Sequence, residues 1–270
     1  MGLLLSILVI SLVVLVHEYG HYVLMRRNGV KVIEFTIGFG PTLFERQLKS
    51  GTMFRIKPIL LGGYARPVTE DGAEGNIEAA SAWAKFKIYM AGMFFNCCAA
   101  FVVFTGLFYS THRAPAMFVE YAHLLHAPPA LMPLAAAFVG SFGMWLATPV
   151  IVVWLIAQGV QQFFGGMAGP IGIIGMGGQV AAQSHDASSL LMNMLMFFGL
   201  INIGLAGFNL LPIFPLDGGR VFDLLLEKLS GGHAKRVCGI YRIASTALFI
   251  GFIVLVIASD VLKAFLAMGR

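Results

Sequence analysis

Charged residues are scarce in this sequence, and their scarcity excludes a soluble globular protein. Only 11% of the 270 residues are charged, whereas 58% are hydrophobic. Soluble domains carry about 25% charged residues, so the composition predicts a protein that crosses a membrane several times. Lysine and arginine are absent from residues 114–219, and the basic residues elsewhere mark cytoplasmic loops. The formal net charge of +5 therefore does not imply a nucleic-acid partner.

Cysteine is also rare. The chain has three cysteines, Cys97, Cys98 and Cys238, an odd number that lacks the spacing of a metal site. Cys97 and Cys98 lie in an apolar run, where cysteine behaves as a small buried hydrophobic residue. The pattern therefore indicates neither a disulfide framework nor a cysteine-ligated zinc site.

Apolar runs of membrane-spanning length predict four core transmembrane helices, at residues 3–25, 83–110, 190–211 and 243–261. Residues 134–158 are also apolar, and we expect a re-entrant or interfacial helix there. The alternative is that the glycine-rich stretch after them crosses the membrane again; its glycines recur at every third position and offer a face for close helix packing (Gly166, Gly169, Gly172, Gly175 and Gly178). Residues 32–66 alternate apolar and polar side chains between glycines, which predicts a small β-hairpin region near the candidate site described below. The expected fold class is therefore an all-α polytopic membrane protein with this β-hairpin region, and residues 1–270 are expected to form a single domain.

The most informative motif is His17-Glu18-Tyr19-Gly20-His21, inside the first apolar run. Histidines four residues apart lie on one face of a helix, so both imidazoles can bind one metal ion. Glu18 lies beside them as a candidate general base for a metal-activated water. A satisfied polar cluster is the alternative, but ionisable residues inside a membrane are costly and usually functional. The motif predicts a catalytic zinc site that needs a third protein ligand.

Asp217 is the candidate third ligand. It follows Pro212 and Pro215, which must break or kink a helix at this point. The carbonyls freed by this break, together with Asn209, form a polar patch that the membrane tolerates only where protein or water lines it. A carboxylate at such a break can complete a His-His-Asp site for one Zn²⁺ ion per chain. The alternative is a helix cap before a cytoplasmic loop.

These paired motifs resemble the site-2 protease family of intramembrane zinc metalloproteases, and most of all its regulator-of-sigma-E branch. The resemblance rests on His17-Glu18-x-x-His21, on Asn209-x-x-Pro212 and on Leu216-Asp217-Gly218, with supporting stretches at residues 35–41, 61–64, 168–173 and 216–220. It implies a metalloendopeptidase that cleaves single-span membrane proteins, such as membrane-bound transcription regulators, within or near their transmembrane segment. This process is regulated intramembrane proteolysis, and it takes place in the lipid bilayer.

Two features depart from that branch. Its members usually carry PDZ modules after the second span, but the stretch between residues 110 and 165 is too short and too apolar for one, so we expect no PDZ domain. The Gly-Pro-x-x-Asn pattern of the family is here Gly92-Met93-Phe94-Phe95-Asn96, without the proline. The missing proline affects the expected local kink more than the chemistry.

Substrate contacts are expected at Asn209, Asn96, Gly62 and Gly63. A helical substrate hides its carbonyl groups, so we expect the strand-like residues 32–65 to hold it extended by strand addition. An ordinary cytoplasmic hairpin without substrate contact is the alternative for this segment.

The basic residues Arg26 and Arg27 close the first span, which places the histidines near the cytoplasmic side of the membrane. We expect a multi-pass protein of the bacterial inner membrane, with its active site near that side. Two other functions stay open. One is a non-proteolytic zinc-binding membrane scaffold, and the other is a metal transporter, which should carry acidic residues along several spans.

Overall fold

The computed structural model describes residues 1–70, 74–111, 118–120, 122, 126, 128–157 and 169–268. The chain divides into two compact units. One unit consists of Ile7–Trp145 and Leu195–Ala206, and the other of Met1–Ser6, Leu146–Met194 and Gly207–Arg270. Each unit is described by itself below.

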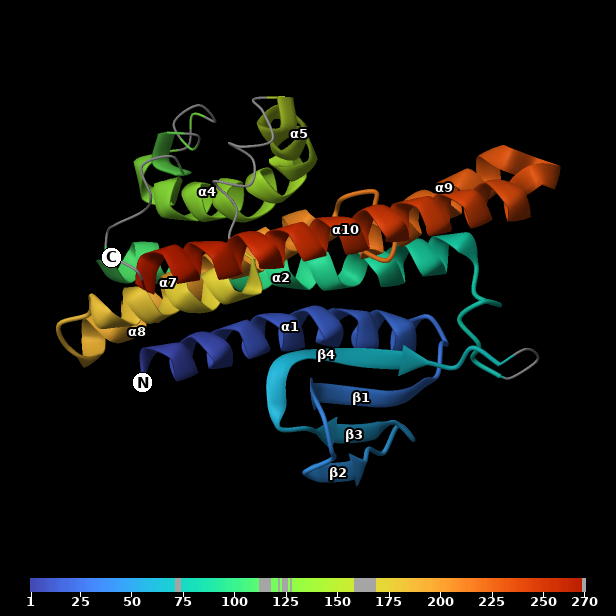
Figure 1. The fold of residues 1–270 in the computed structure, drawn as a ribbon, viewed down its shortest axis with the longest axis horizontal. Helices are drawn as coiled ribbons and strands as arrows, with labels where there is room; N and C mark the ends of the chain where they lie inside the picture. The colour runs from blue at the N-terminus through green and yellow to red at the C-terminus, as the bar shows by residue number, and fades with distance from the viewer. Residues whose placement is uncertain are drawn as a thin grey trace. The chain divides into compact units, whose positions relative to one another are not determined.

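Five stretches of the described residues are helical, long and apolar enough to cross a membrane, which confirms the polytopic fold class (Figure 1). They are α1 (Gly2–Arg27), α2 (Ala82–Thr111), Met132–Val152, α8 (Ala187–Asn209) and Asp217–Lys263. The third stretch runs through α4 (Met132–Phe138), the π-helix η2 (Val139–Gly143) and α5 (Met144–Ala157), and the fifth through α9 (Asp217–Ser230), the 3₁₀ turn η3 (Gly231–His233) and α10 (Ala234–Met268). Shorter helices are the 3₁₀ turn η1 (Pro129–Leu131) and α7 (Pro170–Ala182).

The path of residues 134–158 stays a prediction. Their helix has the length and composition of a span, and a re-entrant helix shares both properties. Gln158, the last residue of the predicted stretch, lies outside the described residues.

The predicted hairpin region is a four-stranded mixed sheet. Its strands are β1 (Val32–Phe39), β2 (Phe44–Gln47), β3 (Met53–Ile56) and β4 (Ile59–Pro67), in the order β2-β3-β1-β4. The two central strands, β1 and β3, are parallel, and each has an antiparallel neighbour at the sheet edge. Figure 1 shows β4 as the strand nearest α1.

A buried carboxylate ties the sheet together. Glu34 of β1 is 3% exposed and forms ion pairs with Arg55 of β3 at 2.8 Å and Arg66 of β4 at 3.2 Å. Thr36 and Tyr64 also donate hydrogen bonds to it. Burial alone would raise the pKa of Glu34, but these hydrogen bonds and the charge of Arg55 outweigh burial and lower the pKa to about 2.

The opposite face of the sheet packs against the end of α1. The ring of Phe35 lies 5.3 Å from that of Tyr22, and a cluster around Met25, Val32 and Ile88 joins α1, β1 and α2. Burying these side chains removes apolar surface from water and fixes the sheet beside the last three turns of α1. The motif at residues 17–21 lies in those turns.

In the other unit, α10 holds the start of α7. The carboxylate of Asp260 is buried and accepts hydrogen bonds from the backbone N–H groups of Gly169 at 3.1 Å and Gly172 at 3.0 Å. These two backbone N–H groups at the start of α7 are thereby paired, although no local side chain caps the helix. Gly178 of α7 serves close packing, because a Cβ there would touch Leu3. Gly166 lies outside the described residues.

Candidate metal centre

The two histidines of α1 converge as their spacing predicts. His17 and His21 are 6% and 8% exposed, and their Nε2 atoms lie 3.2 Å apart. A tetrahedral zinc ion with bonds of about 2.05 Å separates two nitrogen ligands by about 3.3 Å. The spacing of the two nitrogens therefore fits zinc.

The tautomer of His21 is set by α2. Its Nδ1 lies 2.8 Å from the carbonyl oxygen of Ile88, which only accepts hydrogen bonds, so Nδ1 carries the proton. In the neutral imidazole the lone pair is then on Nε2, which faces His17. A backbone carbonyl bound to the far nitrogen is the usual way a histidine ligand is oriented for its metal.

Small residues let α2 approach the histidines closely. A Cβ on Gly92 would lie 2.5 Å from Nε2 of His21 and 2.7 Å from Nε2 of His17. A Cβ on Gly20 would lie 2.6 Å from the carbonyl oxygen of Ala91. Real Cβ atoms do not approach other atoms this closely, so glycine is needed at both positions. The missing side chain of Gly92 leaves space on the side to which both nitrogens point.

Glu18 lies beside the pair and contacts the sheet. Its Oε2 accepts a hydrogen bond of 3.1 Å from the backbone N–H of Ala65 in β4. The hydroxyl of Ser11, two turns earlier on α1, donates to the carbonyl of Leu60 in the same strand. The edge of β4 that does not pair with β1 therefore runs along α1 and reaches the candidate base.

The other predicted residues of this unit lie on α2 and β4. Asn96 lies one turn after Gly92 on the same face of α2 and is fully buried. Its amide oxygen and nitrogen have no hydrogen-bond partner among the described residues. Gly62 and Gly63 have a local reason to be glycine, because a Cβ would meet the ring of Phe39 or the carbonyl of Thr36.

The remaining predicted residues belong to the other unit. Asn209 is the last residue of α8, and Asp217 is the first residue of α9. Asp217 is 7% exposed and lies in the first helical turn, where the helix dipole favours a negative charge. Its role as third ligand stays a prediction.

Sequence reasoning missed the carbonyl of Ile88 and the N–H of Ala65. Both act through backbone atoms, so no side-chain pattern reveals them. The alternation of residues 32–66 could have suggested a strand edge beside the motif, but not which amide would meet Glu18.

Comparison with known proteins adds an independent observation. A profile described as peptidase family M50 matches residues 5–258. A protein of Thermotoga maritima, described as a candidate zinc metalloprotease, is 39% identical over 106 residues, which cover 36% of this chain and 21% of that protein. A protein of Campylobacter jejuni with a similar description is 39% identical over 107 residues, covering 37% and 29%. A third, from Clostridium perfringens, is 24% identical over 339 aligned positions that cover 97% of this chain and 99% of that protein. The first two alignments thus span less than a third of those relatives' length.

Proposed function

The chain belongs to peptidase family M50, the site-2 protease family of zinc metalloproteases, and on that premise we propose that it hydrolyses single-span membrane proteins within or near their transmembrane segment. Its apolar helices make it a multi-pass membrane protein, and its cofactor is Zn²⁺. The observation that carries the proposal is the buried pair His17 and His21, whose Nε2 atoms lie 3.2 Å apart at a place kept open by Gly92.

We infer that Asp217 is the third ligand. His17, His21 and Asp217 are all buried, and each offers one ligand atom. Two imidazole nitrogens and one carboxylate oxygen match the donor set of catalytic zinc sites, which leave a fourth position open. Zinc supplies Lewis acidity there and lowers the pKa of a coordinated water to about 7.

Glu18 is then the catalytic base. Its carboxylate is held beside the histidines by the N–H of Ala65, within the same turn of α1. It takes a proton from the water that attacks the scissile carbonyl and delivers that proton to the leaving nitrogen.

The edge of β4 that does not pair with β1, and that contacts α1 at Leu60 and Ala65, is the proposed substrate-binding edge. β4 is an edge strand, and its outward N–H at Ala65 already reaches Glu18. A substrate segment that pairs with residues 62–65 becomes extended, and its peptide bond comes beside the base. Asn96 and Asn209 offer amide groups for further backbone contacts. The buried amide of Asn96 has no hydrogen-bond partner among the residues that the structure describes, which favours such a role, because a buried polar group without a partner costs about 1–3 kcal/mol.

The proposed setting is the bacterial inner membrane, with the site near its cytoplasmic side. Arg26 and Arg27 end α1 less than two turns after His21, and basic residues favour the cytoplasmic side. We further propose that the chain acts as a single catalytic domain on substrates such as membrane-bound transcription regulators.

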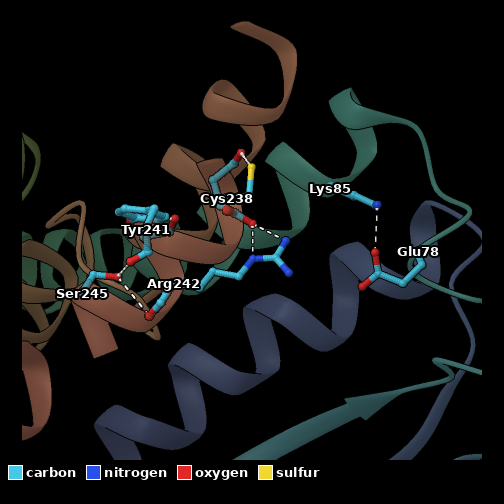
Figure 2. Close-up of polar contacts among 8 residues, drawn as sticks. Glu78, Lys85, Cys238, Tyr241, Arg242 and Ser245 are labelled. Atoms are coloured by element: carbon cyan, nitrogen blue, oxygen red, sulfur yellow. Dashed lines mark hydrogen bonds and ion pairs between the residues drawn. The ribbon is translucent and has the colours of Figure 1, made fainter. Parts of the chain in front are cut away.

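The test is cleavage of a co-reconstituted single-span protein in lipid vesicles by the wild type and by Glu18→Gln. We expect the variant to keep zinc and to lose activity by about 100-fold to 10,000-fold, because only the base is removed. Glu78→Gln is the matched control, since Glu78 is exposed and pairs with Lys85 at 3.2 Å (Figure 2). Unchanged cleavage by Glu18→Gln would refute the assignment of the base. Zinc binding by a wild type that cleaves no substrate would instead favour the non-proteolytic scaffold.

A further inference from the structure

The segment between α8 and α9 is held by two side chains of α10. This segment, residues 210–216, contains both prolines and leads directly into Asp217. Prolines remove backbone donors and leave carbonyls that helix hydrogen bonds would otherwise satisfy. At membrane depth such groups need partners from the protein. Tyr241 supplies a partner for a carbonyl of this segment, and Ser245 supplies one for an N–H group. The two residues lie one turn apart on the same face of α10.

Tyr241 bridges the two ends of the break. Its hydroxyl lies 3.1 Å from the carbonyl oxygen of Pro212 and 3.1 Å from that of Gly219. The hydroxyl has one proton, which the two carbonyls share or exchange. Its ring packs 5.2 Å from the ring of Phe222 on α9, so the side chain is fixed from both directions.

Ser245 holds the middle of the same segment. Its hydroxyl oxygen accepts a hydrogen bond of 3.3 Å from the backbone N–H of Phe214. The hydroxyl proton goes to the carbonyl of Tyr241 at 2.6 Å, which orients the oxygen lone pairs toward the segment (Figure 2). Ser245 is 8% exposed, so water does not compete freely for this contact.

The first turn of α9 packs directly on this segment. A Cβ at Gly218 would overlap the carbonyls of Leu210 and Leu211, and a Cβ at Gly219 would lie 2.5 Å from the backbone of Ile213. Backbone therefore packs against backbone at two successive residues of this turn. Any shift of the segment moves the start of α9, and with it Asp217.

We propose that Tyr241 and Ser245 are positioning residues for Asp217, the third zinc ligand. The inference rests on the proposed role of Asp217. Their hydrogen bonds go to backbone groups before and after Asp217. They fix the backbone on both sides of it, so that its carboxylate is presented in one place instead of several. Outer groups that orient a metal ligand typically change metal affinity by about 10-fold to 100-fold when they are removed.

The test measures the zinc dissociation constant of the full-length protein in detergent, by competition with a chelator. Tyr241→Phe keeps the ring and removes the hydroxyl, and Ser245→Ala removes the other contact. We expect each to raise the dissociation constant by about 10-fold. Ser245→Thr keeps a hydroxyl and should restore tight binding. Tyr109→Phe is the matched control, because the Tyr109 hydroxyl donates to the carbonyl of Ala130, far from residues 207–270 in sequence.

Asp217→Ala separates failure of this inference from failure of the proposed function. If Asp217→Ala binds zinc as tightly as the wild type, the third-ligand assignment is wrong. If Asp217→Ala weakens binding but Tyr241→Phe and Ser245→Ala do not, the positioning role is refuted and the ligand assignment survives. Equal weakening by Tyr109→Phe, or no recovery with Ser245→Thr, would also overturn the positioning role.

Discussion

Adding one methyl group to α2 should abolish tight zinc binding without unfolding the protein. In Gly92→Ala the new Cβ would lie 2.5 Å from Nε2 of His21 and 2.7 Å from Nε2 of His17. Comfortable contact between such atoms needs about 3.5 Å, so the imidazoles must move by about 1 Å. Zinc bonds tolerate changes of about 0.2 Å. A displacement of this size should therefore raise the zinc dissociation constant on the order of 100-fold.

The fold should tolerate this substitution. Gly92 lies inside a helix, where alanine is favoured over glycine by about 1 kcal/mol. The clash involves side-chain rings, whereas the clash at Gly20 would involve the backbone of Ala91. Zinc-free Gly92→Ala should accordingly unfold at nearly the same temperature as the zinc-free wild type.

Gly106→Ala is the control, since it lies on the same helix and a Cβ there meets nothing within 4 Å. Both variants gain the same helix propensity, so a difference in zinc affinity between them reports the clash alone. The assay is chelator competition together with metal analysis of the purified proteins. Zinc binding by Gly92→Ala as tight as by Gly106→Ala would show that the two Nε2 atoms do not bind the metal beside Gly92.

Three further outcomes follow from the structure. Glu34 has a folded-state pKa of about 2 against an ordinary value of 4.5. Its contribution to the free energy of unfolding is therefore complete above about pH 4.5 and is lost as the pH falls toward 2. The full pKa shift corresponds to about 3 kcal/mol, but the arginine partners of Glu34 are partly exposed, so solvent weakens the ion pairs. We therefore expect Glu34→Gln to lower the stability of the sheet by roughly half of that value above pH 4.5. Amide hydrogen exchange in the sheet measures this loss. Asp260→Asn keeps only one acceptor oxygen for two backbone N–H groups, so the free energy of unfolding should fall by about 1–3 kcal/mol, measured by denaturant titration. Gly63→Ala would place a Cβ 2.6 Å from the carbonyl of Thr36, and should accelerate hydrogen exchange in β4 while leaving α8 unchanged.

Local periodicity explains what could be predicted from the sequence. His17 and His21 are four residues apart in an apolar run, and the helix repeat alone brings their side chains to one face. The scarcity of charge and the length of the apolar runs likewise determined the fold class, because a bilayer requires helices of that length. Asp217 was proposed from the prolines and glycines beside it, and the family resemblance, which the match over residues 5–258 supports, came after that proposal.

The strand order of the sheet could not be read from the sequence. Residues 32–66 predict strands and turns, but the parallel pairing of β1 with β3 inserts β1 between segments that follow one another in the chain. Alternation reports which face of a strand is buried and carries no information about its neighbour. The ion pairs of Glu34 with both neighbouring strands are visible only once that order is known.

The sequence by itself determined the candidate ligand types, their helical spacing and the membrane setting, since each follows from residue identity and a fixed backbone repeat. Only the tertiary structure decided which groups orient the candidate ligands and the candidate base. The carbonyl of Ile88 sets the tautomer of His21, the N–H of Ala65 holds Glu18, and the hydroxyl of Tyr241 spans the break before Asp217. These contacts join atoms 67, 47 and 22 to 29 residues apart. All three contacts depend on backbone groups: every residue carries a carbonyl, and every residue except proline carries an N–H. The partners are therefore chosen by packing and leave no mark in the sequence.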